Sequence, residues 1–116
     1  MSRNEENNEK NCTVITAEFT LNGQKFLGLD GGPYFHFNEA ISMTIECEDQ
    51  EEIDYYWEKL SHVKEAEQCG WVKDKFGLSW QIVPYNMGEL IKTEEQIKLM
   101  MNMKKIIIKE LEDANR

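Results

Sequence analysis

The sequence predicts an α+β fold for a single domain of 116 residues. Three observations support this prediction. Segments of β-type alternation flank an Asn-Gly pair, a helix-type pattern separates two further strand patterns, and a second helix-type pattern ends the chain. A chain of this size buries roughly two-thirds of its unfolded surface, which is enough for one hydrophobic core.

The N-terminal part predicts a tail followed by a β-hairpin. Residues 1–11 are rich in Asn and Glu, so we expect a flexible tail before a domain at 12–92. In the strand predicted at 12–21, Thr16, Glu18 and Thr20 share one face, and the apolar face holds Ile15, Ala17, Phe19 and Leu21. The pair "NG" at 22–23 is a strong two-residue hairpin signal. It predicts a return strand at 24–30, and "GGPYFHFN" (31–38) predicts a loop.

A strand followed by a helix is predicted next. The strand at 40–49 places Ser42, Thr44 and Glu46 on one face and Ile41, Met43, Ile45 and Cys47 on the other. Asp49 is suited to cap the following helix, whose core-facing stripe is Ile53, Tyr56, Trp57 and Leu60. Residues 46–58 contain seven acids and no base. Such a run is typical of a solvated helix face, and its spacing does not match a calcium-binding loop.

The last third predicts a second hairpin and a long C-terminal helix. In "CGWVKDKFGLSWQIVP" (69–84), Trp80 and Ile82 fall on one face of the second strand, and the other face holds Ser79, Gln81 and Val83. A single helix is predicted over 93–116, with Thr93 and Gln96 forming a capping box. Its apolar stripe is typical of a core or a subunit interface and consists of Ile97, Met100, Met101, Ile107, Ile108 and Leu111.

Composition excludes several classes of partner. The net charge of −9 argues against nucleic-acid binding, which needs a cationic face. No segment approaches the roughly 20 apolar residues that span a bilayer, and the N-terminus lacks the apolar core of a signal peptide. Three cysteines at 12, 47 and 69 form neither a disulfide framework nor a zinc motif. We therefore predict reduced thiols and a cytoplasmic protein that binds neither nucleic acid nor membrane.

Two segments resemble a known family. They are "TAEFTLNGQKFLGLDGGPYFHFNEAISMTIECEDQEEIDYYWEKL" and "CGWVKDKFGLSWQIVP". Together they are similar to the PhnB-like proteins of the vicinal-oxygen-chelate superfamily, which includes glyoxalase I and bleomycin-resistance proteins. The resemblance covers roughly residues 13–112. It implies one glyoxalase-like βαβββ module, preceded by the terminal hairpin of a truncated first module that lacks its opening strand and helix, and followed by the C-terminal helix at 93–116.

The resemblance also implies where a divalent metal lies in catalytic relatives. Their ending "D-P-D-G-N-x-x-E" overlays "DKFGLSWQ" and places Gln81 where they have a Glu ligand. The strand before the helix places Ser42 at another ligand position. An amide and a hydroxyl are poor ligands for such a metal compared with carboxylate, His or Cys. We therefore expect the metal site to be lost, and no cofactor is predicted.

A polar pocket remains the site hypothesis. Its candidate residues are Ser42, Thr44, Glu46, Ser79, Gln81, His36 and Trp71. These side chains would equally be explained by exposure on a half-open sheet, and a lone loop His is more often simply exposed than catalytic. Three hypotheses stay open: a protein that binds a small organic ligand without a metal, a lyase or isomerase whose site a second subunit completes, and a truncated domain that only self-associates.

Two further expectations concern chemistry and assembly. Relatives are often labelled demethylubiquinone methyltransferases, but no glycine-rich loop between a strand and a helix provides a nucleotide-type cofactor site here. An exposed sheet edge and sheet face recruit other chains. We therefore predict a homodimer with an interface above roughly 2,000 Å², formed largely by the 12–29 hairpin and the C-terminal helix.

Overall fold

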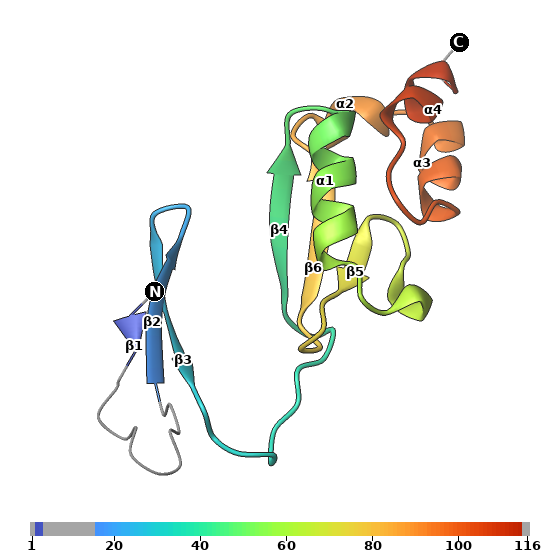
Figure 1. Ribbon diagram of the computed structural model, residues 1–116. Coiled ribbons are helices and arrows are strands. Elements are labelled where there is room, and N and C mark those ends of the chain that lie inside the picture. The colour runs from blue at the N-terminus through green and yellow to red at the C-terminus, as the bar shows by residue number, and fades with distance from the viewer. Residues whose placement is uncertain (1, 4–15, 115–116) are drawn as a thin grey trace. The chain divides into compact units, whose positions relative to one another are not determined.

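The computed structural model describes residues 2–3 and 16–114 and divides into two compact units, Met1–His36 and Phe37–Arg116 (Figure 1). It confirms the α+β class. The predicted tail at 1–11 lies outside the described residues except for Ser2 and Arg3. These two residues form the short strand β1 (Ser2–Arg3).

The first unit is an antiparallel sheet built around the predicted hairpin. Strands β2 (Thr16–Leu21) and β3 (Gln24–Leu29) pair along their full length, and β1 pairs with the other edge of β2. Asn22 and Gly23 form the turn with φ values of 49° and 83°, as a two-residue hairpin loop requires. Phe19 and Phe26 face each other across the strands, with stacked rings 5.5 Å apart. The Asn-Gly signal and the apolar alternation therefore set the observed register.

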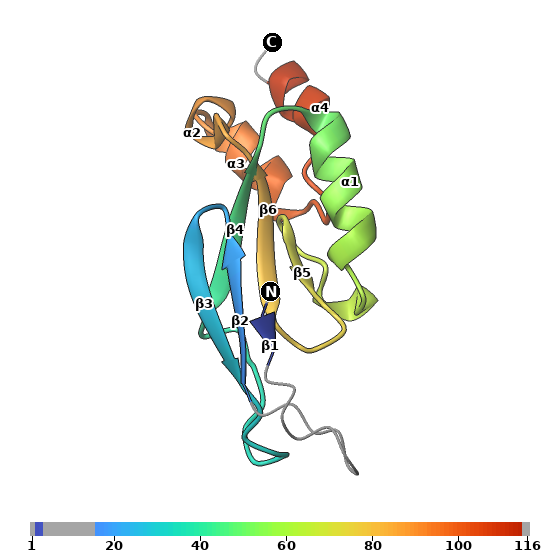
Figure 2. The ribbon, with the colours of Figure 1, turned by 60° about the vertical axis from the view of Figure 1, so that its left-hand side comes forward.

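The second unit contains a three-stranded sheet in the order β4-β6-β5. Strand β4 (Ser42–Cys47) runs parallel to the central strand β6 (Ser79–Pro84), and β5 (Trp71–Lys73) runs antiparallel to it. Between β4 and β5 lie helix α1 (Gln50–Leu60) and the short 3-10 helix η1 (Lys64–Ala66). Figure 2 shows α1 lying along one face of this sheet.

Helix α1 forms as the sequence predicts. Asp49 is its N-cap and accepts a hydrogen bond of 2.9 Å from the backbone N–H of Glu52. The helix presents Ile53 to a core formed with Cys47, Val72 and Ile82, all buried. The predicted stripe residues Tyr56, Trp57 and Leu60 pack against this core, together with Ile45 and Trp80. Burial of this apolar stripe is the main force that holds the helix on the sheet.

The prediction of one continuous helix over 93–116 is wrong. The structure instead has α2 (Met87–Leu90), α3 (Glu94–Met101) and α4 (Ile108–Asp113), with residues 102–107 non-helical. The capping box of Thr93 and Gln96 is confirmed. The chain leaves the helix because its carbonyl groups find partners elsewhere. The backbone N–H groups of Cys69 and Gly70 donate to the carbonyls of Met103 and Lys104, each at 2.8 Å.

The break changes which side chains are buried. A second core contains Leu90, Met103, Ile106 and Leu111, whereas the continuous-helix stripe omitted three of these four. Met101, which that stripe included, is 58% exposed. Most of the remaining stripe packs inside its own chain, as Met100, Ile107 and Ile108 contact this core. The C-terminal segment therefore exposes less apolar surface than the sequence predicted.

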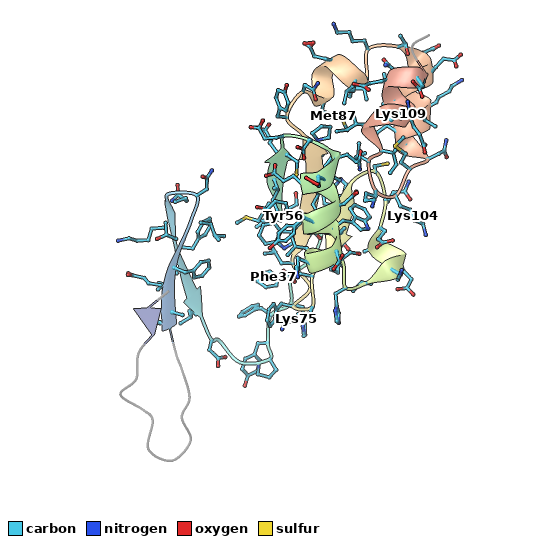
Figure 3. All side chains as sticks on the ribbon, turned by 45° about the horizontal axis from the view of Figure 1, so that its top comes forward. Phe37, Tyr56, Lys75, Met87, Lys104 and Lys109 are labelled. Carbon is cyan, nitrogen blue, oxygen red and sulfur yellow. The ribbon has the colours of Figure 1, made fainter. Side chains whose placement is uncertain are left out.

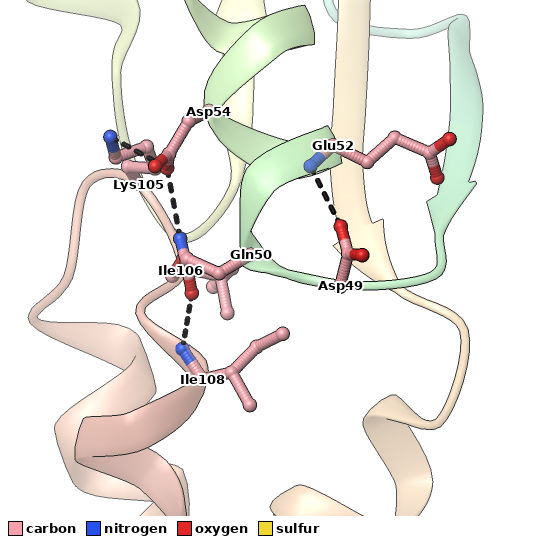
Figure 4. Close-up of polar contacts among 7 residues, drawn as sticks. All are labelled: Asp49, Gln50, Glu52, Asp54, Lys105, Ile106 and Ile108. Carbon is pink, nitrogen blue, oxygen red and sulfur yellow. Dashed lines mark hydrogen bonds and ion pairs between the residues drawn. The ribbon is translucent and has the colours of Figure 1, made fainter.

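Gln50, the first residue of α1, hydrogen-bonds the non-helical segment 102–107 and the start of α4 to the module formed by β4, α1, β5 and β6 (Figure 4). Its amide Nε2 donates to the Ile106 carbonyl at 2.9 Å, and its Oε1 accepts from the Ile108 N–H at 2.8 Å. Nε2 also donates to Asp54 at 3.0 Å, and Asp54 pairs with Lys105 at 2.9 Å. Hydrogen bonds from Lys105 and Gln50 lower the pKa of Asp54.

Gly70 is required where β5 meets the same segment. Its φ is +86°, and an added Cβ would lie 3.0 Å from the Ile82 carbonyl oxygen and 3.2 Å from Cγ1 of Ile106. Only glycine adopts this backbone conformation without strain and leaves that space free.

Candidate functional site

One face of the β4-β6-β5 sheet carries most of the predicted site residues. Apolar side chains of all three strands, including Ile45, Val72 and Ile82, belong to the core that packs on α1. Because successive side chains of a strand alternate between faces, the residues between them point to the face away from α1. We call this face the polar face, and it holds Ser42, Thr44, Glu46, Trp71, Lys73, Ser79 and Gln81.

Strand register arranges these side chains in two rows across the sheet. Ser79 on the central strand lies between Ser42 on β4 and Lys73 on β5. One step further along the sheet, Gln81 lies between Thr44 and Trp71. Thr44 and Glu46 are exposed, and Trp71 is half-buried. The structure thus brings together six of the seven predicted residues.

The two serine hydroxyls of the Ser42–Ser79–Lys73 row differ in their hydrogen bonding. Nε2 of Gln81 donates to Oγ of Ser42 at 2.9 Å, so both half-buried groups are paired. Ser79 is 0% exposed, and within the part of the chain that the structure describes, its Oγ has no hydrogen-bond partner. Buried hydroxyl groups are nearly always hydrogen-bonded, so this group requires an explanation.

An ion pair lies beside this hydroxyl. Nζ of Lys73 contacts Oε2 of Glu39 at 2.6 Å, with 24% of the Lys73 side chain and 63% of the Glu39 side chain exposed. The hydrogen bond from Lys73 lowers the pKa of Glu39. Figure 3 labels Phe37 and Lys75 at the end of the sheet where β5 turns into β6. A Cβ on Gly77 in this turn would lie 3.9 Å from that of Phe37, so residues 37–39 lie close to the row.

Sequence reasoning missed Lys73 and Glu39. A signal for Lys73 exists, because alternation along β5 places it on the same face as Trp71. No comparable signal identifies Glu39, which lies in an irregular segment between β3 and β4. His36 is exposed and belongs to the first unit, whereas the polar face belongs to the second.

The residues of the polar face do not suit a divalent metal. Ser42 and Gln81 occupy the positions that the family resemblance assigns to ligands, but they are neutral and hydrogen-bond each other. Among residues 2–3 and 16–114, no three His, Cys, Asp or Glu side chains gather as a metal site would require. Zinc, magnesium and calcium sites are normally built from such groups.

The two described cysteines have structural roles. Cys47 is buried in the α1 core, and burial, followed by the charges of Glu52 and Asp49, raises its pKa to about 11. A protonated thiol is a poor nucleophile. Cys69 is free, adopts a positive φ of 50°, and its backbone holds the C-terminal segment. The third cysteine, Cys12, lies outside the described residues.

Comparison with known proteins identifies the family. The family model described as 3-demethylubiquinone-9 3-methyltransferase matches residues 1–83. The chain belongs to this PhnB-like family. A PhnB protein from Bacillus cereus has a similar solved structure, with 38% sequence identity and a TM-score of 0.53. The similarity covers 71% of this chain and 74% of that one. No curated protein matches the chain.

The family match ends inside β6, at residue 83, so it covers β2, β3, β4, α1, β5 and every residue named on the polar face. It does not include the second core around Leu90 and Leu111. Among the helices that the structure describes, none combines the length and apolarity needed to cross a membrane.

Proposed function

We propose that this PhnB-like protein is a homodimer that binds a small organic ligand at the polar face and does so without a catalytic metal. The observation that supports this most strongly is the buried, unpaired hydroxyl of Ser79 in a row of polar side chains. A few placed polar groups on an otherwise apolar scaffold are typical of small-molecule sites.

Methyl transfer is not part of the proposal, although the family description names it. Nucleotide-type cofactors are usually held by glycine-rich turns between a strand and a helix. Here β4 passes to α1 through Glu48 and Asp49, and β6 passes to α2 through Tyr85 and Asn86. The two carboxylates would repel a cofactor phosphate or carboxylate.

The hairpin of the first unit supports the dimer. Leu27 and Leu29 of β3 are 65% and 70% exposed. In addition, β3 is an edge strand of the sheet that the described residues form. Exposed apolar edge strands pair readily with another chain. Light scattering should therefore give twice the chain mass of 13.7 kDa. Leu27→Glu should produce the monomer, whereas Lys25→Glu on the same strand should not; a wild-type monomer would contradict the dimer.

Ligand binding and metal content can be tested on the same sample. Protein purified without chelator or His-tag is analysed by plasma emission spectrometry and by native mass spectrometry. We expect no stoichiometric metal and an added mass from a retained organic molecule. Gln81→Ala should lower the retention of this molecule. One metal ion per chain would contradict the metal-free proposal and favour the lyase or isomerase instead. Retention unchanged by Gln81→Ala would contradict the placement of the ligand on the polar face.

A further inference from the structure

The Ser42–Ser79–Lys73 row is suited to an anion. Neighbouring strands lie about 4.8 Å apart, so three in-register side chains span roughly 10 Å. Lys73 supplies a cation, and Ser79 supplies a hydroxyl that is free to donate. Ser42 already accepts a hydrogen bond from Gln81, which leaves its own O–H available as a donor. Three donors therefore lie side by side in a protein whose net charge is −9.

Glu39 shows which chemistry this row accepts. Its carboxylate comes from an irregular segment and contacts Lys73 at 2.6 Å while remaining largely exposed itself. Besides Lys73, its carboxylate accepts a hydrogen bond only from its own backbone N–H among the causes that lower its pKa, and exposed ion pairs contribute little stability. A ligand carboxylate or phosphate would replace it at Lys73, which lies next to Ser79 in the row.

We propose that Lys73, Ser79 and Ser42 bind the anionic group of the ligand, a carboxylate or a phosphate, and that Glu39 occupies Lys73 when the ligand is absent. This inference rests on the proposed function and adds the chemical class of the ligand. It also assigns a role to the Ser79 hydroxyl. Charge-assisted hydrogen bonds are stronger than neutral ones, which favours an anion over a neutral group at this hydroxyl.

The test is a titration of the ¹⁵N-labelled protein with sodium acetate, inorganic phosphate and acetamide, at an ionic strength kept constant with sodium chloride. Acetate or phosphate should shift the amide signals of Lys73 and Ser79 saturably, and the stronger of the two identifies the anion. Acetamide, the neutral control, should bind at least tenfold more weakly, because hydrogen bonds to charged groups are the stronger ones.

Four variants separate this site from general attraction to positive charge. Lys73→Met should abolish the shifts, whereas Lys75→Met, at the exposed neighbouring lysine in the turn, should leave them unchanged. Glu39→Gln should tighten anion binding by about two- to fivefold, the range expected for removal of an exposed competing ion pair. Ser79→Ala should weaken binding by about tenfold without lowering the melting temperature, because it removes an unpaired group.

Three results would overturn the inference. They are equal losses in Lys73→Met and Lys75→Met, acetamide binding as tight as acetate binding, and the absence of any saturable shift. The second result would leave small-molecule binding intact and remove only the anion. Retention of an organic molecule, measured by mass spectrometry, tests the proposed function separately.

Discussion

Replacing Gln50 with Ala should release the C-terminal segment from the module. The change removes three hydrogen bonds and leaves the carbonyl of Ile106 and the N–H of Ile108 without partners. An unpaired buried polar group costs about 1–3 kcal/mol. Because both contacts are only partly buried, water will satisfy some of this loss, and we expect a total of about 2–3 kcal/mol. This is a large share of the 5–15 kcal/mol that is typical of a domain.

Gln68→Ala is the matched control. Gln68 also donates to the C-terminal segment, at 2.7 Å to the Met101 carbonyl, but Gln68 is exposed and this carbonyl has a second donor in the Cys69 thiol. Its removal should cost about 0.5–1 kcal/mol, the usual net value of a single hydrogen bond.

Urea denaturation followed by two signals gives the measurement. Trp57 and Trp80 pack on the α1 core, so tryptophan fluorescence reports mainly on the module, while far-ultraviolet circular dichroism also reports on α3 and α4. In Gln50→Ala the dichroism signal should begin to fall at lower urea than the fluorescence signal. The reasoning is refuted if Gln50→Ala and Gln68→Ala lose equal stability, or if the two signals of Gln50→Ala still coincide.

Further predictions concern the sheet and its surroundings. Trp80→Ala should lower the free energy of unfolding by about 3 kcal/mol in chemical denaturation, as a large-to-small core change. Gln81→Ala on the opposite face should lower it by less than about 1 kcal/mol. A larger loss for Gln81→Ala would contradict the assignment of Trp80 to the core face and Gln81 to the polar face. Gly70→Ala should cost about 2–4 kcal/mol, from positive-φ strain and overpacking, and a neutral effect would contradict the contacts of its added Cβ. The Cys47 thiol has a folded pKa of about 11, above the usual value of 9.0, so the unfolded chain ionises first and stability should fall as pH rises through this interval. Cys47→Ala should remove that part of the pH dependence, and an unchanged difference between wild type and variant across this range would show that the thiol does not contribute.

The sequence predicts most local structure because the relevant interactions are local. The Asn22-Gly23 turn and the Asp49 cap depend on neighbouring residues and occur as expected. The break at 102–107 was not predictable in this way, since it depends on hydrogen bonds to Cys69 and Gly70 from another part of the chain. Tertiary hydrogen bonds here override a continuous helical pattern.

The grouping of side chains on the polar face was predictable from local alternation as well. Alternation along β4 and β6 correctly grouped Ser42 with its strand neighbours and placed Ser79 and Gln81 on one face. It did not reveal the contact between Lys73 and Glu39, because an irregular segment has no periodicity that tells which strand it will meet. The burial of Ser79 was equally hidden, since burial depends on what covers a residue and not on its own pattern.

The parallel pairing of β4 with β6 has a consequence for synthesis on the ribosome. β6 is central in the sheet but last in sequence among its three strands, and α1 and β5 are translated between it and β4. Until residue 84 has left the exit tunnel, neither β4 nor β5 has the strand it pairs with, and the apolar side of α1 has no complete sheet to cover. Non-local pairing of this kind delays folding. A nascent chain that stalls before β6 should therefore be sensitive to protease and a substrate for chaperones, although it already contains the whole helix.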